Sequence, residues 1–320
     1  MLKENFDNRP KALKKKLNVL PQNPETASQE KAVGLGRFPS WLHRKLPKGR
    51  GLLETGLALE GERLHTVCEE AKCPNLLECW SRKSATFLVM GKVCTRACGF
   101  CEIGFSKAPP PLDPEEPKNV AEAAKKLGLK HIVITMVARD DLEDQGANHL
   151  IQILKEIKRV LPNCTLEILT SDFNGNKDCL NKLLKEPIDI FNHNIETVRS
   201  LTPRVRHVAT YERTLEVLAH MASNRTSLKP YVKSGLMVGL GESRDEVFET
   251  IRDLKEAGSD IITIGHYLQA SNRKLTVKAF ISPEEFELYN EFGKSIGVKA
   301  MYTGPFVRSS YNAESILENL

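Results

Sequence analysis

The sequence predicts an α/β fold: a partial (β/α) barrel of about six units, with extensions at its N-terminal and C-terminal ends. Apolar segments with strand character alternate with amphipathic helical segments from residue 85 onward. Asp, Ser or Asn commonly precedes each helical segment, and Gly or Pro often follows it. Such alternation builds βαβ units and a parallel sheet. Six or seven units are too many for half of a dinucleotide-binding sheet, so a full or partial barrel is favoured.

The individual elements follow from local patterns. Strands are expected at 85–90, 131–137, 165–170, 188–192, 232–240, 260–268 and 298–302. Helices are expected between them, at 118–127, 147–160, 176–185, 210–223, 244–257 and 283–295. The clearest helical stripe, with the three- and four-residue spacing of a face that packs on a core, comprises Leu150, Ile153, Leu154, Ile157 and Leu161. Barrels of this kind carry their reactive groups at the carboxyl ends of the strands, which places the loop after residue 90 at the active face.

Composition limits the class of protein. The 320 residues are 41% hydrophobic and 27% charged, as in ordinary globular proteins with a substantial core. No apolar run is long enough to cross a bilayer, and charged residues interrupt the segment 1–20 where a secretion signal would lie. A basic transit peptide stays open, although Glu4 and Asp7 argue against it. We expect a cytoplasmic protein without a membrane partner, whose 8 cysteines are reduced thiols.

The first 50 residues form a basic arm. They hold 12 of the 46 Lys and Arg but only 4 of the 41 Asp and Glu, and five prolines interrupt them. Two interpretations stay open: a solvated arm, or a docking surface for an acidic partner. Nucleic acid is not expected as the partner, because the arm lacks alternating basic and aromatic residues and any known binding motif.

Six of the cysteines fall between residues 68 and 101, in two triplets. One has the spacing Cx4Cx5C and the other Cx3Cx2C; they comprise Cys68, Cys73 and Cys79, and Cys94, Cys98 and Cys101. Structural zinc takes four ligands, typically as two close pairs, and neither triplet offers two pairs. A [4Fe–4S] cluster takes one ligand on each of its four irons, so three cysteines leave one iron open to a small molecule.

Other interpretations of the cysteines were weighed by chemistry. Zinc knuckles are disfavoured by the spacing, and ferredoxin-type clusters usually have four cysteines each. Cys164 and Cys179 stand alone beside apolar residues and are best explained as small buried hydrophobes. His193, Asn194 and Glu196 follow a later strand, so they are expected at the same active face; they either contact bound molecules or cap the strand end.

The Cx3Cx2C motif, with Phe100 before its last cysteine and a strand before its first, resembles the signature of the radical SAM superfamily. Further segments resemble lipoyl synthases, and together they run from about residue 60 to 313. These segments are Cys68–Trp80, Val137–Leu142, Asn192–Thr197, Ser234–Glu242 and Gly304–Tyr311. One departure is His266, in Gly-His-Tyr-Leu-Gln-Ala, where that family usually has Gln.

The resemblance implies an assignment of the site and of the domains. One [4Fe–4S] cluster would be held by Cys94, Cys98 and Cys101, with S-adenosylmethionine on its open iron. A second, auxiliary cluster would be held by Cys68, Cys73 and Cys79 and completed by Ser310 of Arg-Ser-Ser-Tyr. The chain would then divide into a basic arm (1–50), an auxiliary-cluster segment (51–84), a radical SAM partial barrel (85–304) and a C-terminal tail (305–320).

The resemblance also implies the reaction. A lipoyl synthase inserts two sulfur atoms, at carbons six and eight of a protein-bound N6-octanoyl-lysine. A 5′-deoxyadenosyl radical from S-adenosylmethionine removes the hydrogens, and the auxiliary cluster supplies the sulfur. The implied partners are octanoylated carrier domains (2-oxoacid dehydrogenase E2 subunits and the glycine cleavage H protein) and an electron donor such as ferredoxin or flavodoxin. A sulfur-inserting enzyme of biotin-synthase type and a zinc-stabilised binding scaffold remain as alternatives.

Overall fold

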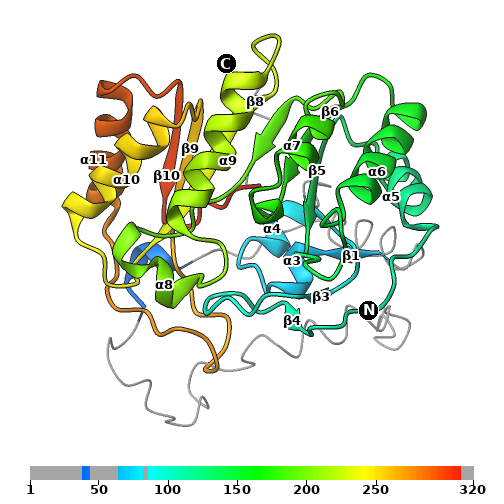
Figure 1. Cartoon of the computed structure of the whole chain (residues 1–320). Helices are drawn as coiled ribbons and strands as arrows, with labels where there is room; N and C mark the ends of the chain where they lie inside the picture. Colours follow the sequence, from blue (N-terminus) through cyan, green and yellow to red (C-terminus); the bar gives the residue numbers. More distant parts are fainter. Residues whose placement is uncertain (1–37, 44–63, 82–85, 311–320) are drawn as a thin grey trace, which may run out of the picture.

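The computed structural model describes residues 38–43, 64–81 and 86–310. In this part of the chain, eight strands form one sheet in the order β1-β2-β5-β6-β7-β8-β9-β10 (Figure 1). Their bounds are β1 (His65–Thr66), β2 (Thr86–Val89), β5 (His131–Met136), β6 (Thr165–Leu169), β7 (Ile190–Asn192), β8 (Tyr231–Val238), β9 (Ile261–His266) and β10 (Ala300–Gly304). Strand β1 runs antiparallel to β2, and all the other pairs are parallel.

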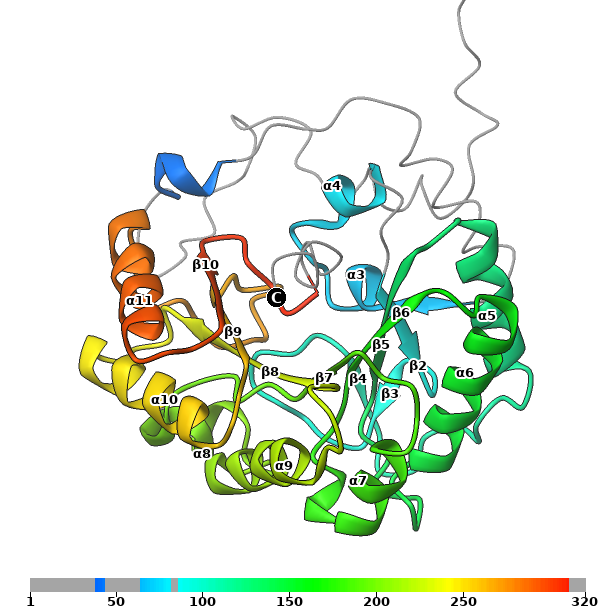
Figure 2. The ribbon, with the colours of Figure 1, turned by 90° about the horizontal axis from the view of Figure 1, so that it is seen from above.

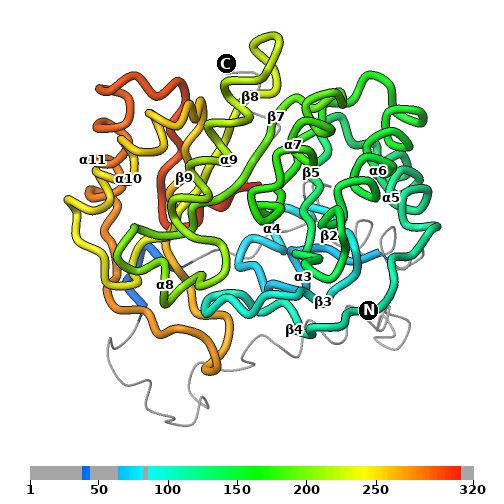
Figure 3. The backbone as a smooth tube through the Cα atoms, in the orientation of Figure 1, coloured from blue at the N-terminus to red at the C-terminus, as the bar shows by residue number. Residues whose placement is uncertain are grey.

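Six main helices follow the parallel strands from β2 to β9, each leading to the next strand of the sheet. They are α5 (Glu116–Lys126), α6 (Ala147–Val160), α7 (Lys177–Leu183), α9 (Tyr211–Asn224), α10 (Arg244–Glu256) and α11 (Pro283–Ser295). Figure 2 shows them as an outer arc around the strands, and Figure 3 follows the chain along this arc. In the described part β10 pairs only with β9, and β1 only with β2, so the barrel is open. The predicted α/β partial barrel is confirmed, including its seven strands and six helices.

Small elements at the ends of the strands were not predicted. They are α3 (Val67–Glu70), α4 (Leu76–Ser81), β3 (Val93–Cys94), β4 (Gly104–Phe105), α8 (Thr202–Val205) and the 3-10 turns η2 (Ser40–Leu42), η3 (Phe173–Gly175) and η4 (Arg199–Leu201). Pieces of two to six residues carry no periodicity of their own, so tertiary contacts decide them. The predicted basic arm, apart from 38–43, and the end of the tail beyond residue 310 lie outside the described residues.

Local sequence explains where the main helices begin. The Ser243 side chain accepts from the backbone of Glu246, whose carboxylate in turn accepts from the Ser243 N–H, which is a complete capping box at the start of α10. Thr210 caps α9, and Ser282 caps α11 just before Pro283 at its first position. Ser243 and Ser282 are residues of the kind that the sequence pattern used to place the helices, whereas Thr210 was expected inside its helix.

The strands have two buried faces. Side chains such as Ile132, Leu166 and Ile168 belong to the main apolar core, together with the helix stripe predicted around Leu150. Inside the barrel lies a polar layer, in which the fully buried Lys233 Nζ contacts Glu167 Oε1 at 2.9 Å and Asn192 Nδ2 donates to the same oxygen at 3.0 Å. A buried charge is tolerated only when it is paired, as here. This layer lies on strand positions N-terminal to those that line the cavity described next.

Candidate functional site

A cavity of about 350 Å³ lies at the carboxyl ends of the parallel strands. Residues that end or follow five successive strands line it, as expected for this class of fold. They include Val137 and Ala138 after β5, Thr170, Ser171 and Asp172 after β6, His193, Asn194 and Glu196 after β7, Met237 in β8, and Tyr267 and Leu268 after β9. The active face predicted from the strand ends therefore carries several polar side chains that line one cavity.

The second cysteine triplet enters this cavity from the loop after β2. Cys94, Cys98 and Cys101 all line it, and the N–H of Cys101 donates to the Cys98 carbonyl at 3.2 Å. Burial, together with the neighbouring cysteines of the triplet, raises the pKa of Cys98 to about 12 and that of Cys101 to about 11. Such thiols are protonated at neutral pH, so thiolates would form here only with a metal that compensates their charge.

The first triplet lies beside the second. A turn brings its members together: the Cys73 N–H donates to the Cys68 carbonyl at 3.0 Å, and the Cys79 N–H donates to Asn75 at 2.9 Å. Cys73 lines the cavity, whereas Cys68 is buried behind it. Burial raises the pKa of Cys68 to about 12, and the nearby Cys73 and Cys79 also raise it.

The C-terminal tail joins the two triplets to the barrel. Val307, Arg308, Ser309 and Ser310 all line the cavity. The Asn75 amide donates to the Phe306 carbonyl at 2.7 Å, and the Ser309 hydroxyl donates to Asn194 Oδ1 at 2.8 Å. Figure 2 shows the chain after β10 beside α3. Five of the seven candidate ligands therefore line one cavity. Cys68 and Cys79 do not line it, but both belong to the same triplet as Cys73, which does.

Each triplet offers three thiols as ligands for a metal ion or a cluster. Within the described ranges, no group of three or more His, Cys, Asp or Glu side chains is arranged to hold a single metal ion. A zinc site needs all of its thiolates about 2.3 Å from one ion. Cysteines on separate irons of a cluster are spaced more widely. Within each triplet, neighbouring thiols raise one another's pKa, so the members of each triplet lie close together.

The predicted polar residue His193 is an internal support. Its Nδ1 donates to the Thr170 carbonyl at 2.9 Å, which leaves Nε2 as an acceptor for Arg206 Nη2 at 3.2 Å. Burial lowers the pKa of His193 to about 3, and the Arg206 charge lowers it too, although Asp172 opposes this. The ring is therefore neutral at physiological pH and holds the guanidinium of Arg206 at the cavity wall.

Glu196 is held in an unusual conformation. Its φ of 69° lies in the left-handed region, and backbone bonds of 2.9 Å to Gly235 and from Met237 fix it there. Burial raises the pKa of its carboxyl, which Asn194 Nδ2 contacts at 3.1 Å. A non-glycine residue with positive φ beside a cavity is typical of functional sites, where the fold compensates local strain.

Arg96 was missed by the sequence reasoning. It lies between Cys94 and Cys98, and it forms a two-pronged contact with Asp140 (Nε to Oδ2 2.9 Å, Nη2 to Oδ1 2.7 Å) and a third with Asp172 at 2.7 Å. The cysteine loop is thereby fixed to the loops after β5 and β6. Asp140 belongs to a segment that carried the family resemblance, and this was the one available signal.

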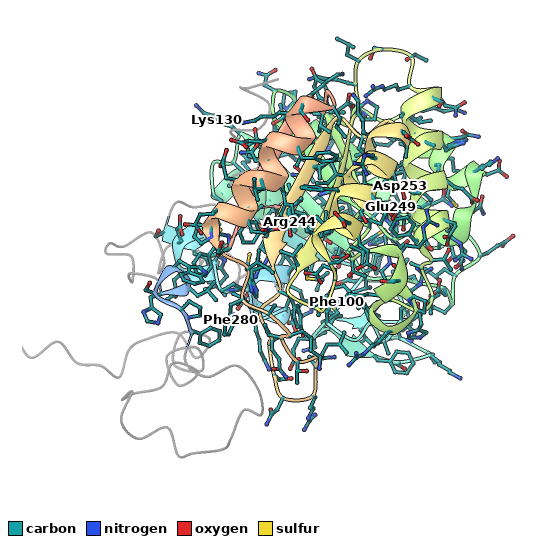
Figure 4. The ribbon with its side chains drawn as sticks, turned by 90° about the vertical axis from the view of Figure 1, so that its left-hand side faces the viewer. Phe100, Lys130, Arg244, Glu249, Asp253 and Phe280 are labelled. Carbon is teal, nitrogen blue, oxygen red and sulfur yellow. The ribbon has the colours of Figure 1, made fainter. Side chains whose placement is uncertain are left out.

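His266, the departure from the family pattern, is fully buried and does not line the cavity. Its Nδ1 lies 2.6 Å from the Tyr267 carbonyl and its Nε2 lies 3.1 Å from the Ala279 carbonyl. The residue therefore joins the two ends of the loop after β9. Figure 4 shows the neighbouring Phe280 beside η2, consistent with its ring contact to Phe38 at 5.6 Å.

The chain was compared with known proteins. The Radical SAM superfamily model matches residues 88–254. A lipoyl synthase of Protochlamydia amoebophila is 58% identical over 98% of this chain and 96% of its own length. A lipoyl synthase of Chlamydia trachomatis serovar L2 (strain 434/Bu) is 51% identical over 92% and 93%. The crystal structure of Streptococcus suis SuiB bound to precursor peptide SuiA has a TM-score of 0.53 at 13% identity, covering 72% of this chain and 50% of that one, which is a likeness of fold alone. Among the described helices, none is long and apolar enough to span a membrane.

Proposed function

The chain belongs to the lipoyl synthase family of the radical SAM superfamily, and we propose that it inserts two sulfur atoms into a protein-bound octanoyl group. The sulfurs would go to carbons six and eight of an octanoyl chain linked to the N6 atom of a lysine. One observation carries the proposal: two cysteine triplets and the tail segment that contains Ser310 meet at one cavity at the mouth of the barrel. The high identity to lipoyl synthases favours this activity over an enzyme of biotin-synthase type.

We assign the cofactor ligands by position. Cys94, Cys98 and Cys101 would hold a [4Fe–4S] cluster whose open iron takes S-adenosylmethionine. Cys68, Cys73 and Cys79, with Ser310, would hold a second cluster. When bound, these groups supply the radical chemistry that breaks unactivated C–H bonds and the sulfur that replaces the hydrogens. No side chain of this site could do so by acid–base chemistry, because such C–H bonds have no acidic proton.

The chain's own residues would orient the reactants and exclude water. Arg96, Asp140 and Asp172 fix the cysteine loop against the strand ends. The wall is largely apolar, with Val137, Leu236, Met237 and Leu268 suited to an octanoyl chain. Asn194, Glu196 and the neutral His193 with Arg206 provide the polar contacts. Shielding of this kind keeps a radical from reacting with solvent before it meets its target.

The partners and the compartment are part of the proposal. The octanoylated carriers would be the E2 subunits of 2-oxoacid dehydrogenases and the glycine cleavage H protein, and the electrons would come from ferredoxin or flavodoxin. A cytoplasmic location agrees with the need for reduced thiols at both triplets.

An anaerobic turnover assay tests the proposal. The purified holoenzyme is mixed with an octanoyl-lysine peptide, S-adenosylmethionine and a chemical reductant, and the peptide is analysed by mass spectrometry. We expect a product in which two sulfur atoms replace two hydrogens, and none from a Cys98→Ala variant. Cleavage of S-adenosylmethionine without any sulfur in the peptide would refute the proposed activity.

A further inference from the structure

Three segments of the described chain meet at the mouth of the cavity. They are residues 91–109 before α5, 199–209 around α8, and 267–282 after β9. Their common point is Gly99: its N–H donates to the Val205 carbonyl at 2.9 Å, and its carbonyl accepts from the Leu275 N–H at 3.1 Å. Figure 1 shows β4, α8 and the orange segment after β9 along the same lower edge. Each segment also lines the cavity, through Phe100, Arg206 and Leu268 respectively.

The exposed charges on these segments have one sign. We call five of them the basic rim: Lys92, Lys107, Arg204, Arg273 and Lys278. The three segments contain a single acidic residue, Glu102, which is half-buried and already bound to Lys72 at 2.6 Å and Ser271 at 2.9 Å. Within the described ranges, the basic rim has no ion pair. Like charges held together without partners repel each other, which an acidic partner would relieve.

The basic rim lies close to the reacting centre. Lys274, on the same segment as Arg273, lowers the pKa of Cys101 by its charge, so this segment reaches the cysteine loop. Phe105 on β4, 53% exposed, adds an aromatic side chain between Lys92 and Lys107. An exposed aromatic residue among cations is typical of protein-binding surfaces.

Four acidic side chains lie on two other segments near the strand ends. Asp113 and Glu115 precede α5, and Asp141 and Glu143 follow β5; all four are exposed. The basic rim and these four carboxylates differ in sign, so an acidic partner surface is favoured at the rim and disfavoured beside the carboxylates.

We propose that the basic rim docks the folded carrier domain through acidic residues that flank its octanoylated lysine. This inference rests on the proposed function. A tethered octanoyl chain can enter the cavity only if its carrier domain comes to rest at the mouth. The charge of the rim then determines the chemistry of the partner surface, which must be acidic around the lysine.

Charge reversal in the full-length holoenzyme tests the docking. One variant carries Lys107→Glu, Arg204→Glu, Arg273→Glu and Lys278→Glu; the control carries Lys118→Glu, Lys125→Glu, Lys185→Glu and Lys294→Glu, at exposed positions outside the three segments. Each is assayed with an octanoylated carrier domain and with a short octanoyl-lysine peptide that has uncharged neighbours. We expect kcat/KM of the rim variant for the carrier domain to fall about tenfold, because a surface that steers the partner is lost. The fall should come from a higher KM, with kcat unchanged. Its activity on the peptide and both activities of the control should stay at the wild-type level.

The outcomes separate the two proposals. If the wild type modifies neither the carrier domain nor the peptide, the proposed function fails. If the wild type is active, but the rim variant processes the domain as well as the control does, the docking surface is refuted. An equal loss on both substrates also refutes it, because the charges would then act on the reaction itself. Direct binding of the unmodified carrier domain, measured at 50 and 300 mM salt, provides an independent check: wild-type affinity should fall with salt and variant affinity should be weak at both.

Discussion

His193 illustrates how burial determines charge at the scale of one residue. Its ring is neutral because burial lowers its pKa and the charge of Arg206 lowers it too, although the hydrogen bond to the Thr170 carbonyl acts in the opposite direction. The sequence indicated only that a histidine follows a strand at the active face. Whether that histidine contacts a ligand or supports an arginine depends on Arg206 and Thr214, which come from a different part of the chain.

The neutral His193 predicts a sensitivity to acid. The folded state has a pKa of about 3 for this ring against an ordinary value of 6.5. Between these pH values the unfolded chain binds a proton that the folded chain does not, so stability falls as the pH drops below 6.5. Each pH unit in this window costs about 1.4 kcal/mol.

Unfolding free energies of the wild type and His193→Asn, measured from pH 7.5 to 5, test this. The difference between the two proteins should be constant above pH 7 and should shift against the wild type by about 1.4 kcal/mol per unit below pH 6. Parallel curves across the whole range would show that His193 is not the buried neutral group described. Arg206, Asp172 and Arg96 also face this ring, so they are left unchanged in both proteins.

Ser310 gives a second prediction at this scale. It lines the cavity, and an alkoxide is a harder and more easily lost ligand of iron than a thiolate. The variant Ser310→Cys should therefore keep the iron content of the wild type but stop after one sulfur insertion, because the cluster no longer comes apart. Mass spectrometry of the peptide product decides between one and two sulfurs; complete conversion by the variant contradicts the assigned role.

At the scale of elements, helices α5 and α6 each contribute one side chain that holds the start of the cysteine loop. The backbone of Met90, at the end of β2, has a positive φ of 67°. Its N–H donates to both carboxylate oxygens of Glu116, at 3.0 and 2.9 Å, and His149 Nε2 lies 2.7 Å from the same carboxylate. One residue of each helix thus fixes the turn that leads to Cys94.

This support can be tested with a conservative change. Glu116→Gln keeps the shape but removes the charge that strengthens both contacts, so we expect a loss of about 1.5–3 kcal/mol in the free energy of unfolding. The exposed Glu122→Gln on the same helix should change it by less than about 0.5 kcal/mol. Denaturant unfolding of the two variants gives the answer. A Glu116→Gln protein as stable as Glu122→Gln would mean that the carboxylate does not hold the turn.

The elements also show where prediction from sequence succeeds. The seven parallel strands and six helices were predicted because each is long enough to show a period and is bounded by capping residues. The two-residue strands β1, β3 and β4 have no such signal, and their pairing partners determine them. The role of Arg96 could not be predicted from local sequence either, because its partners Asp140 and Asp172 lie on two other loops.

At the scale of the whole molecule, the fold brings together segments that are far apart in the sequence. Asn75 and Phe306 are in contact, as are Asn194 and Ser309. Sequence spacing alone identified the six cysteines as candidate ligands, because the members of each triplet lie within 12 residues of one another. The association of the tail with them came only from the family resemblance, and contacts over more than 100 residues give no local signal. The assignment of the ligands and the division into domains remain predictions.

The measurement that tests the central claim most directly is the iron and sulfide content of the wild type and three variants, all purified anaerobically. Two variants each replace one whole cysteine triplet with Ala, and a third, as control, replaces Cys164 and Cys179. The wild type and the control should carry about eight irons, and each triplet variant about four, as expected for one four-iron cluster per triplet. A protein that contains zinc instead of iron, or one in which removal of either triplet leaves the iron content unchanged, would contradict the two-cluster account.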